Sequence, residues 1–151
     1  MPNQVYRFIL SNGAADSNGN IADPLGWDLT RYKTNPVVLW NHNWQDLPIG
    51  RTLQMEATAD RLTATFQLAD THLAREIAQL IDAGYIRGAS PGWRPVEWEV
   101  RQDGQGRFLG IHSHRQELIE ASLVGIPDNR EALRTARLSD GQLVTAGQDR
   151  L

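Results

Sequence analysis

Strict alternation of apolar and polar residues is the feature of this sequence that most limits its fold. Apolar side chains occupy every second position across residues 62–68, and the same period recurs across residues 96–100. Because successive side chains of a strand point to opposite faces, this period predicts strands buried on one face. Further strands are predicted at residues 4–10, 37–40, 52–57, 107–114 and 118–124.

Clear helical periodicity is confined to residues 70–83. Asp70 can cap the start of this helix and Gly84 can end it. Its predicted buried face consists of Leu73, Ile77, Leu80 and Ile81. A second, short helix is predicted at residues 129–138. With so many strands, we expect a mainly β (α+β) fold: a closed or nearly closed β-barrel of about seven strands with flanking helices.

The chain of 151 residues is long enough for one domain with a substantial core. We assign residues 1–138 to the domain and the small, polar residues 139–151 to a flexible C-terminal tail. A formal charge of −3 gives no reason to expect a nucleic acid or an anionic membrane as partner. The absence of cysteine excludes disulfides, thiolate metal sites and a cysteine nucleophile. With neither a membrane-spanning run nor a signal peptide, we expect a soluble, intracellular protein.

A serine with small neighbours follows the predicted helix. Ser90 lies between Gly88 and Gly92, and Pro91 comes directly after it. Glycine permits close approach of other groups, and proline biases the preceding residue toward an extended conformation. A nucleophile needs such a fixed and uncrowded position. The alternative interpretation is an ordinary turn serine between two elements.

Two further side chains with catalytic chemistry lie on other predicted strands. His42 follows the buried strand at residues 37–40, and Glu120 lies within the apolar strand at residues 118–124. An imidazole can accept the proton of a serine, and a carboxylate can fix the tautomer of that imidazole. Spacing alone does not show that Ser90, His42 and Glu120 meet. The alternatives are a half-buried histidine bonded to a loop carbonyl and an edge-strand glutamate facing water.

A histidine pair also has metal-binding spacing. His112 and His114 lie on one face of the predicted strand at residues 107–114, and such a pair can bind zinc. No third ligand has a suggestive spacing in the sequence. We therefore interpret both as surface histidines and predict no metal site.

Four segments of the chain, in this order, resemble the motifs of the tailed-phage prohead protease family, which is similar to the herpesvirus protease assemblin. They are NPVVLWNH at 35–42, LPIGR at 47–51, RGASPGW at 87–93 and LIEASLVGIP at 118–127. Each motif alone is weak, but four in order are fairly specific. The resemblance extends over most of the chain, from about residue 5 to about residue 133.

The resemblance implies a serine endopeptidase that processes capsid and scaffold proteins during prohead maturation, with self-cleavage as an added option. It places the nucleophile at Ser90, the general base at His42 and the third triad member at Glu120, with His114 as the fallback. It implies no cofactor and no metal. The expected substrates are the phage major capsid protein and a scaffold segment, inside the assembling prohead in the bacterial cytoplasm. A homo-oligomer is a further option, because assemblin depends on dimerisation.

Two departures from the family pattern affect the mechanism. Trp93 stands where the family usually has phenylalanine, and we expect it to fill the same apolar slot. Pro91 has no N–H, so the residue after the serine cannot donate to an oxyanion. By similarity to assemblin, the backbone near residues 127–130 is the favoured donor. Two other functions compete: a catalytically inactive scaffolding barrel of the same fold, and a zinc hydrolase that uses His112 and His114.

Overall fold

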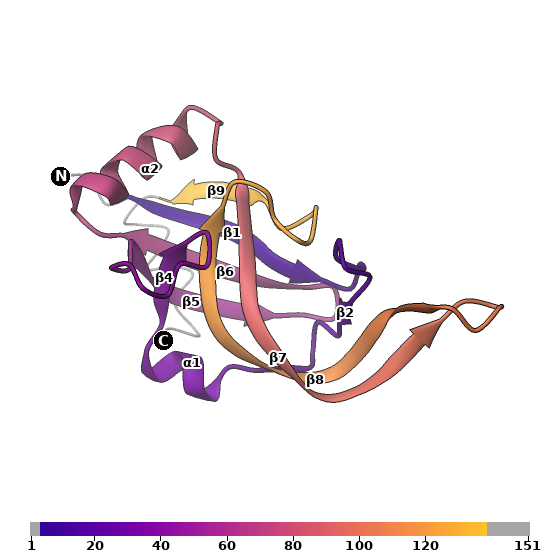
Figure 1. The fold of residues 1–151 in the computed structure, drawn as a ribbon. Helices are drawn as coiled ribbons and strands as arrows, with labels where there is room; N and C mark the ends of the chain where they lie inside the picture. Colours follow the sequence, from indigo (N-terminus) through magenta and orange to yellow (C-terminus); the bar gives the residue numbers. More distant parts are fainter. Residues whose placement is uncertain (1–3, 139–151) are drawn as a thin grey trace.

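The computed structural model describes residues 4–138, so the predicted tail at 139–151 lies outside the described residues (Figure 1). One sheet of nine strands dominates the fold. The strands are β1 (Val5–Asn12), β2 (Ile21–Ala22), β3 (Trp27–Asp28), β4 (Val37–Trp40), β5 (Gly50–Ala57), β6 (Arg61–Leu68), β7 (Gly88–Gln102), β8 (Phe108–Val124) and β9 (Arg134–Leu138). The helices among these residues are α1 (Thr30–Thr34) and α2 (His72–Asp82).

The sheet is open, and the predicted closed or nearly closed β-barrel is wrong. The strand order is β2-β8-β4-β5-β6-β1-β9, with β3 and β7 also paired to β8. A barrel requires the two ends of such a path to hydrogen-bond. Here β7 meets the chain before β9 at an isolated bridge between Gly88 and Leu133, which does not extend into a ladder. Strand β7 instead pairs with β8 along its whole length, and the two strands extend from the body as a long arm (Figure 1).

Strand β8 organises the sheet because it pairs with four other strands. Its 17 residues pair with β7 in antiparallel orientation and with β2, β3 and β4 in parallel orientation. Six of the seven residues 118–124 at the inner end of β8 are buried, which suits a strand with neighbours on both sides. The segment 118–124 is therefore an interior strand, and Glu120 lies inside the protein.

The core is one cluster that draws on β1, β4, β5, β6, β7 and β8 and on both helices. All four alternating apolar residues of β6 are buried, as their period predicted. Helix α2 begins one residue later than predicted, with Thr71 rather than Asp70 as N-cap, and Gly84 adopts a φ of +85° after its end. Its buried face agrees with the predicted one at Ile77 and Ile81 only. The buried residues are Ala74, Ile77, Ala78 and Ile81, whereas Leu73 and Leu80 are exposed.

Two other sequence-based expectations need correction. The segment 129–138 is not a helix, because its second half forms β9 and pairs with the free edge of β1. The alternating residues Val96, Trp98 and Val100 do form a strand, but all three are exposed. They belong to the half of β7 that leads to the turn before β8, and Figure 1 shows no second layer over the β7/β8 arm. Local pattern thus identified the strand but not its distance from the core.

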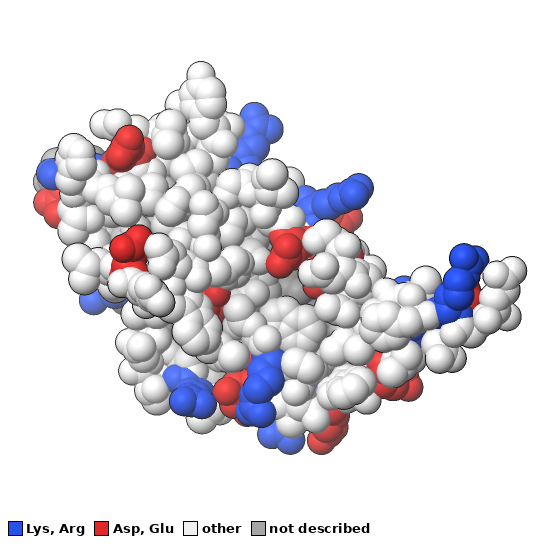
Figure 2. Space-filling model, viewed as in Figure 1, with Lys and Arg blue, Asp and Glu red and all other residues white. Residues whose placement is uncertain are grey.

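None of the helices in residues 4–138 is long and apolar enough to cross a membrane. On the face shown in Figure 2, acidic and basic side chains are interspersed with large neutral areas. This face therefore carries no continuous basic field of the kind that binds a nucleic acid backbone.

Candidate active site

Three strands bring the predicted catalytic residues to one region. Strand β8 lies between β4 and β7: Ser122 pairs with Leu39 on one side and with Ser90 on the other. The chain after β4 then turns at His42, next to the same part of β8. Residues that are far apart in the sequence are thus neighbours because β8 is shared.

His42 is held at the end of β4 in an unusual backbone conformation. Asn41 and His42 have φ values of 50° and 59°, in the left-handed region that non-glycine residues rarely adopt. Two hydrogen bonds to β8 hold this turn: Asn41 N donates to the Leu123 carbonyl at 2.8 Å, and His42 N donates to Ser122 Oγ at 3.1 Å. Such backbone strain clusters at functional sites, where the surroundings enforce it.

The side chains of His42 and Glu120 are in direct contact. His42 Nδ1 is hydrogen-bonded to Glu120 Oε1, and Ser122 Oγ donates to Glu120 Oε2 at 2.8 Å. Both carboxylate oxygens therefore have partners, which explains how a carboxylate that is 3% exposed is tolerated in an apolar strand. Ser122 connects the strained turn to the carboxylate, because its hydroxyl also accepts from the backbone of His42. Sequence reasoning did not single out Ser122.

Gly92 makes room for this carboxylate. It is paired with Glu120 across β7 and β8, and a Cβ at position 92 would lie 2.8 Å from Glu120 Cγ. Real Cβ atoms essentially never approach other atoms so closely. The sequence suggested that the glycines leave space around Ser90; the structure shows that Gly92 leaves space for Glu120.

The carboxylate also sets the proton affinity of the imidazole. The hydrogen bond to Glu120 raises the pKa of His42 above its ordinary value of 6.5, although partial burial opposes this effect. The negative charge of Asp128 acts in the same direction as Glu120. With Nδ1–H donated to the carboxylate, Nε2 is the nitrogen left to accept a proton.

Ser90 lies on the same sheet face as Glu120. Directly opposed residues of antiparallel strands project to the same side, so Ser90 shares the face of Ser122 and of Glu120, two residues before it. The serine is 1% exposed, and its hydroxyl has no hydrogen-bond partner among the described residues. Buried hydroxyls are usually hydrogen-bonded, so this one stands out. The structure thus joins His42 to Glu120 directly, with the Ser90 hydroxyl unbonded.

An open groove of about 560 Å³ runs past these residues. His42, Glu120 and Gly92 line it together with the aromatic rings of Trp44 and Trp93. Ser90 lines a small adjoining hollow, and the two spaces share five lining residues. These are Asp16, Asn20, Pro91, Trp93 and Asp128. Trp93 packs edge-to-face against Trp27, with ring centroids 5.9 Å apart, which fixes one wall of the groove.

The second histidine pair lies elsewhere. His112 and His114 contact Asp23, and His114 also contacts Glu99. His114, the fallback for the third triad residue, is bonded to Asp23 and Glu99. Nδ1 of His42 is bonded to Glu120 instead. Asp23 was not recognised from the sequence, because 89 residues separate it from His112 and no motif connects them.

A family model described as caudovirus prohead serine protease matches residues 27–144. This chain belongs to the caudovirus prohead serine protease family. The match covers β3 to β9 and includes His42, Ser90 and Glu120. No curated protein and no solved structure gave a significant match.

Membership of the prohead protease family defines the function at a coarse level. The resemblance seen in the four sequence motifs is confirmed. The family identifies a serine peptidase of capsid maturation, which acts on phage capsid proteins inside the assembling prohead in the host.

Proposed function

We propose that this prohead protease is an endopeptidase with a Ser90–His42–Glu120 triad that cleaves the major capsid protein and a scaffold segment during maturation. The observation that carries the proposal is the bond between His42 Nδ1 and the buried Glu120 carboxylate. A carboxylate in this position orients the ring and stabilises the imidazolium that forms during proton transfer. Ser90, on the same face, supplies the nucleophile.

The chemistry follows from the order of these groups. Ser90 Oγ attacks the scissile carbonyl while His42 Nε2 takes the hydroxyl proton. The imidazolium, held by Glu120, then gives this proton to the leaving amine, which produces an acyl-enzyme. Water activated by His42 hydrolyses the ester and releases Ser90. In the resting enzyme the serine hydroxyl has no partner in residues 4–138, and we expect substrate binding to align it with Nε2.

The oxyanion requires donors other than the residue after the serine, because Pro91 has no N–H. The N–H groups of residues 128–130 are our proposed source, because Pro127 also lacks one. Asp128 and Asn129 from this segment line the hollow at Ser90. Asn129 is 6% exposed and tied to Asn12 and Glu131 by hydrogen bonds, so the segment is held in place before substrate arrives.

The groove fits an extended peptide better than a small molecule. It is open to solvent and lined by Trp44 and Trp93, whose rings offer apolar area for substrate side chains. Self-cleavage would use the same triad when the chain's own end enters the groove.

The decisive experiment is coexpression with the phage's major capsid protein, read by intact mass. Ser90→Ala and His42→Ala should each reduce processing by several orders of magnitude, and the double variant should be scarcely worse, because the two residues act as a unit. His72→Ala, at an exposed histidine on α2, is the matched control and should process normally. Processing at the wild-type rate in Ser90→Ala would refute the proposal.

The unbonded hydroxyl of Ser90 favours one alternative, a catalytically inactive assembly protein of the same fold. A serine-directed phosphonate separates the two. An active enzyme forms one covalent adduct at Ser90, and this adduct disappears in His42→Ala because the serine is no longer activated. If the protein is an inactive relative, neither the wild type nor His42→Ala forms an adduct.

A further inference from the structure

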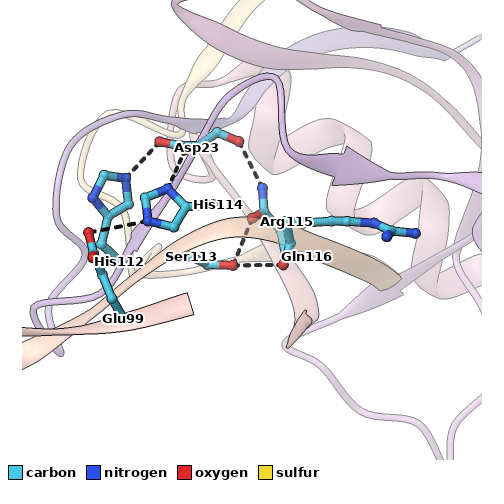
Figure 3. A network of polar contacts seen from close by, with 7 residues as sticks. All are labelled: Asp23, Glu99, His112, Ser113, His114, Arg115 and Gln116. Atoms are coloured by element: carbon cyan, nitrogen blue, oxygen red, sulfur yellow. Dashed lines mark hydrogen bonds and ion pairs between the residues drawn. The ribbon is translucent and has the colours of Figure 1, made fainter. Parts of the chain in front are cut away.

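A cluster of metal-ligating side chains lies outside the proposed triad. Asp23, at the end of β2, meets His112 and His114 from β8 (Figure 3). One potential ligand atom from each residue lies within 4.8 Å of the other two. His112 Nε2 is 2.7 Å from Asp23 Oδ1, and His114 Nδ1 is 3.1 Å from Asp23 Oδ2. Two imidazoles and a carboxylate that converge on one point are a ligand set for zinc.

We propose that Asp23, His112 and His114 form a binding site for a divalent transition-metal ion, with zinc as the ion that suits these ligands. Zinc would be bound by a carboxylate oxygen of Asp23, by Nε2 of His112 and by Nδ1 of His114, with water as the fourth ligand. Without metal, each imidazole donates a proton to the carboxylate. Zinc replaces these protons and converts the three side chains from hydrogen-bond partners into ligands.

The residues around the cluster already orient the ligands. His114 Nε2 lies 3.2 Å from Glu99 Oε1, so this nitrogen can donate to Glu99 and leave Nδ1 for the metal (Figure 3). Metal-binding histidines commonly donate their second N–H to a carboxylate, which fixes ring and tautomer. Glu99 faces His112 across β7 and β8, and it therefore projects to the same side of the sheet.

The backbone of Asp23 is anchored by a buried polar network. Its N–H donates to the Ser113 carbonyl at 2.9 Å, and its carbonyl accepts from Gln116 Nε2 at 2.8 Å. Ser113 and Gln116 are fully buried and hydrogen-bonded to each other. The carboxylate and both imidazoles are partly exposed, at 38%, 31% and 46%. The site is therefore rigid at its base and open to an ion from solvent.

The position of the cluster indicates a structural metal rather than a catalytic one. Ile111 lines the groove, but none of Asp23, His112 and His114 does. The ion would join β8 to the segment 13–28, which contributes Asp16 and Asn20 to the groove. A bound ion would thus stabilise one wall of the groove without entering the chemistry.

The test measures zinc binding by protein without a polyhistidine tag, after treatment with a chelator. Titration with zinc chloride against a chromophoric competitor should give one site per chain. His112→Gln, His114→Gln and Asp23→Asn should each weaken this site at least about tenfold, and Glu99→Gln should weaken it by a similar factor through the orientation of His114. His72→Gln, at an exposed histidine remote in sequence, is the matched control and should bind as wild type.

Imidazole NMR resonances of the wild type provide a second measurement that does not depend on the folding of variants. Zinc should perturb His112 and His114 and leave His42 and His72 unchanged. The melting temperature should rise with zinc in wild type but not in His112→Gln, because an ion that binds only the folded state stabilises it. The proposal fails if zinc binding is unaffected by His112→Gln and Asp23→Asn, or if the resonances of His42 shift instead.

Discussion

Replacing Gly92 by alanine tests whether the Glu120 carboxylate needs its present position. A Cβ at position 92 would lie 2.8 Å from Glu120 Cγ and 2.9 Å from Cδ, whereas ordinary contact begins near 3.4 Å. Oε1 lies closer still, so the carboxylate would have to move by about 1 Å, away from β7. Its partners, His42 and Ser122, are bonded to the two carboxylate oxygens and would lose their alignment.

The expected magnitudes differ for stability and for activity. Overpacking of a buried site costs about 1–3 kcal/mol of unfolding free energy, so Gly92→Ala should still fold. A displacement of catalytic groups approaching 1 Å can cost about 10²-fold in rate, and we expect a loss of this order in capsid protein processing. The pKa of His42 should fall toward 6.5, because the hydrogen bond to Glu120 is the main cause of its elevation.

The measurements are the initial rate of capsid protein cleavage, urea unfolding and a pH titration of the His42 ring by NMR. Gly104→Ala is the matched control, because it lies in the turn between β7 and β8 and an added Cβ has nothing within 4 Å. It should leave all three quantities unchanged. If Gly92→Ala processed within about twofold of wild type while the His42 pKa fell, the carboxylate would have no catalytic importance.

The remaining predictions concern pH and stability. General-base catalysis needs neutral His42, so the wild-type processing rate should fall as pH drops through its raised pKa, at a midpoint above 6.5. Glu120→Gln should move this midpoint to lower pH and reduce the rate on the plateau; a pH–rate profile with an unmoved midpoint would contradict the role of Glu120. Asp128→Asn should move the midpoint in the same direction but by less, because Asp128 acts through charge alone. Thr71→Ala removes the N-cap of α2 and should cost about 1 kcal/mol in urea unfolding, with processing unchanged at a permissive temperature. Phe66→Ala empties a fully buried core position and should cost about 3–5 kcal/mol; a loss below about 1 kcal/mol would show that the core is not packed as described.

The sequence by itself determined the local structure well. Alternation at residues 62–68 identified β6, and the periodicity at residues 70–83 identified α2, because both signals depend on which side of a local element is buried. The motif at residues 87–93 and the carboxylate inside an apolar strand singled out Ser90 and Glu120 as residues that needed an explanation. Family membership was also accessible from the order of four motifs.

Only the tertiary structure decided how these elements close and which side chains meet. A strand pattern states which face is buried but not which partner completes the sheet, so the barrel was predicted and an open sheet with a β7/β8 arm was found. The same limit explains why β9 was predicted as a helix: its conformation depends on the free edge of β1, more than 120 residues earlier. The pairing of β8 with β4 places Ser122 beside His42, and the pairing of β8 with β2 places Asp23 beside His112. Neither contact could be predicted from the sequence, because hydrogen bonds between strands that are far apart along the chain produce no fixed spacing between residues.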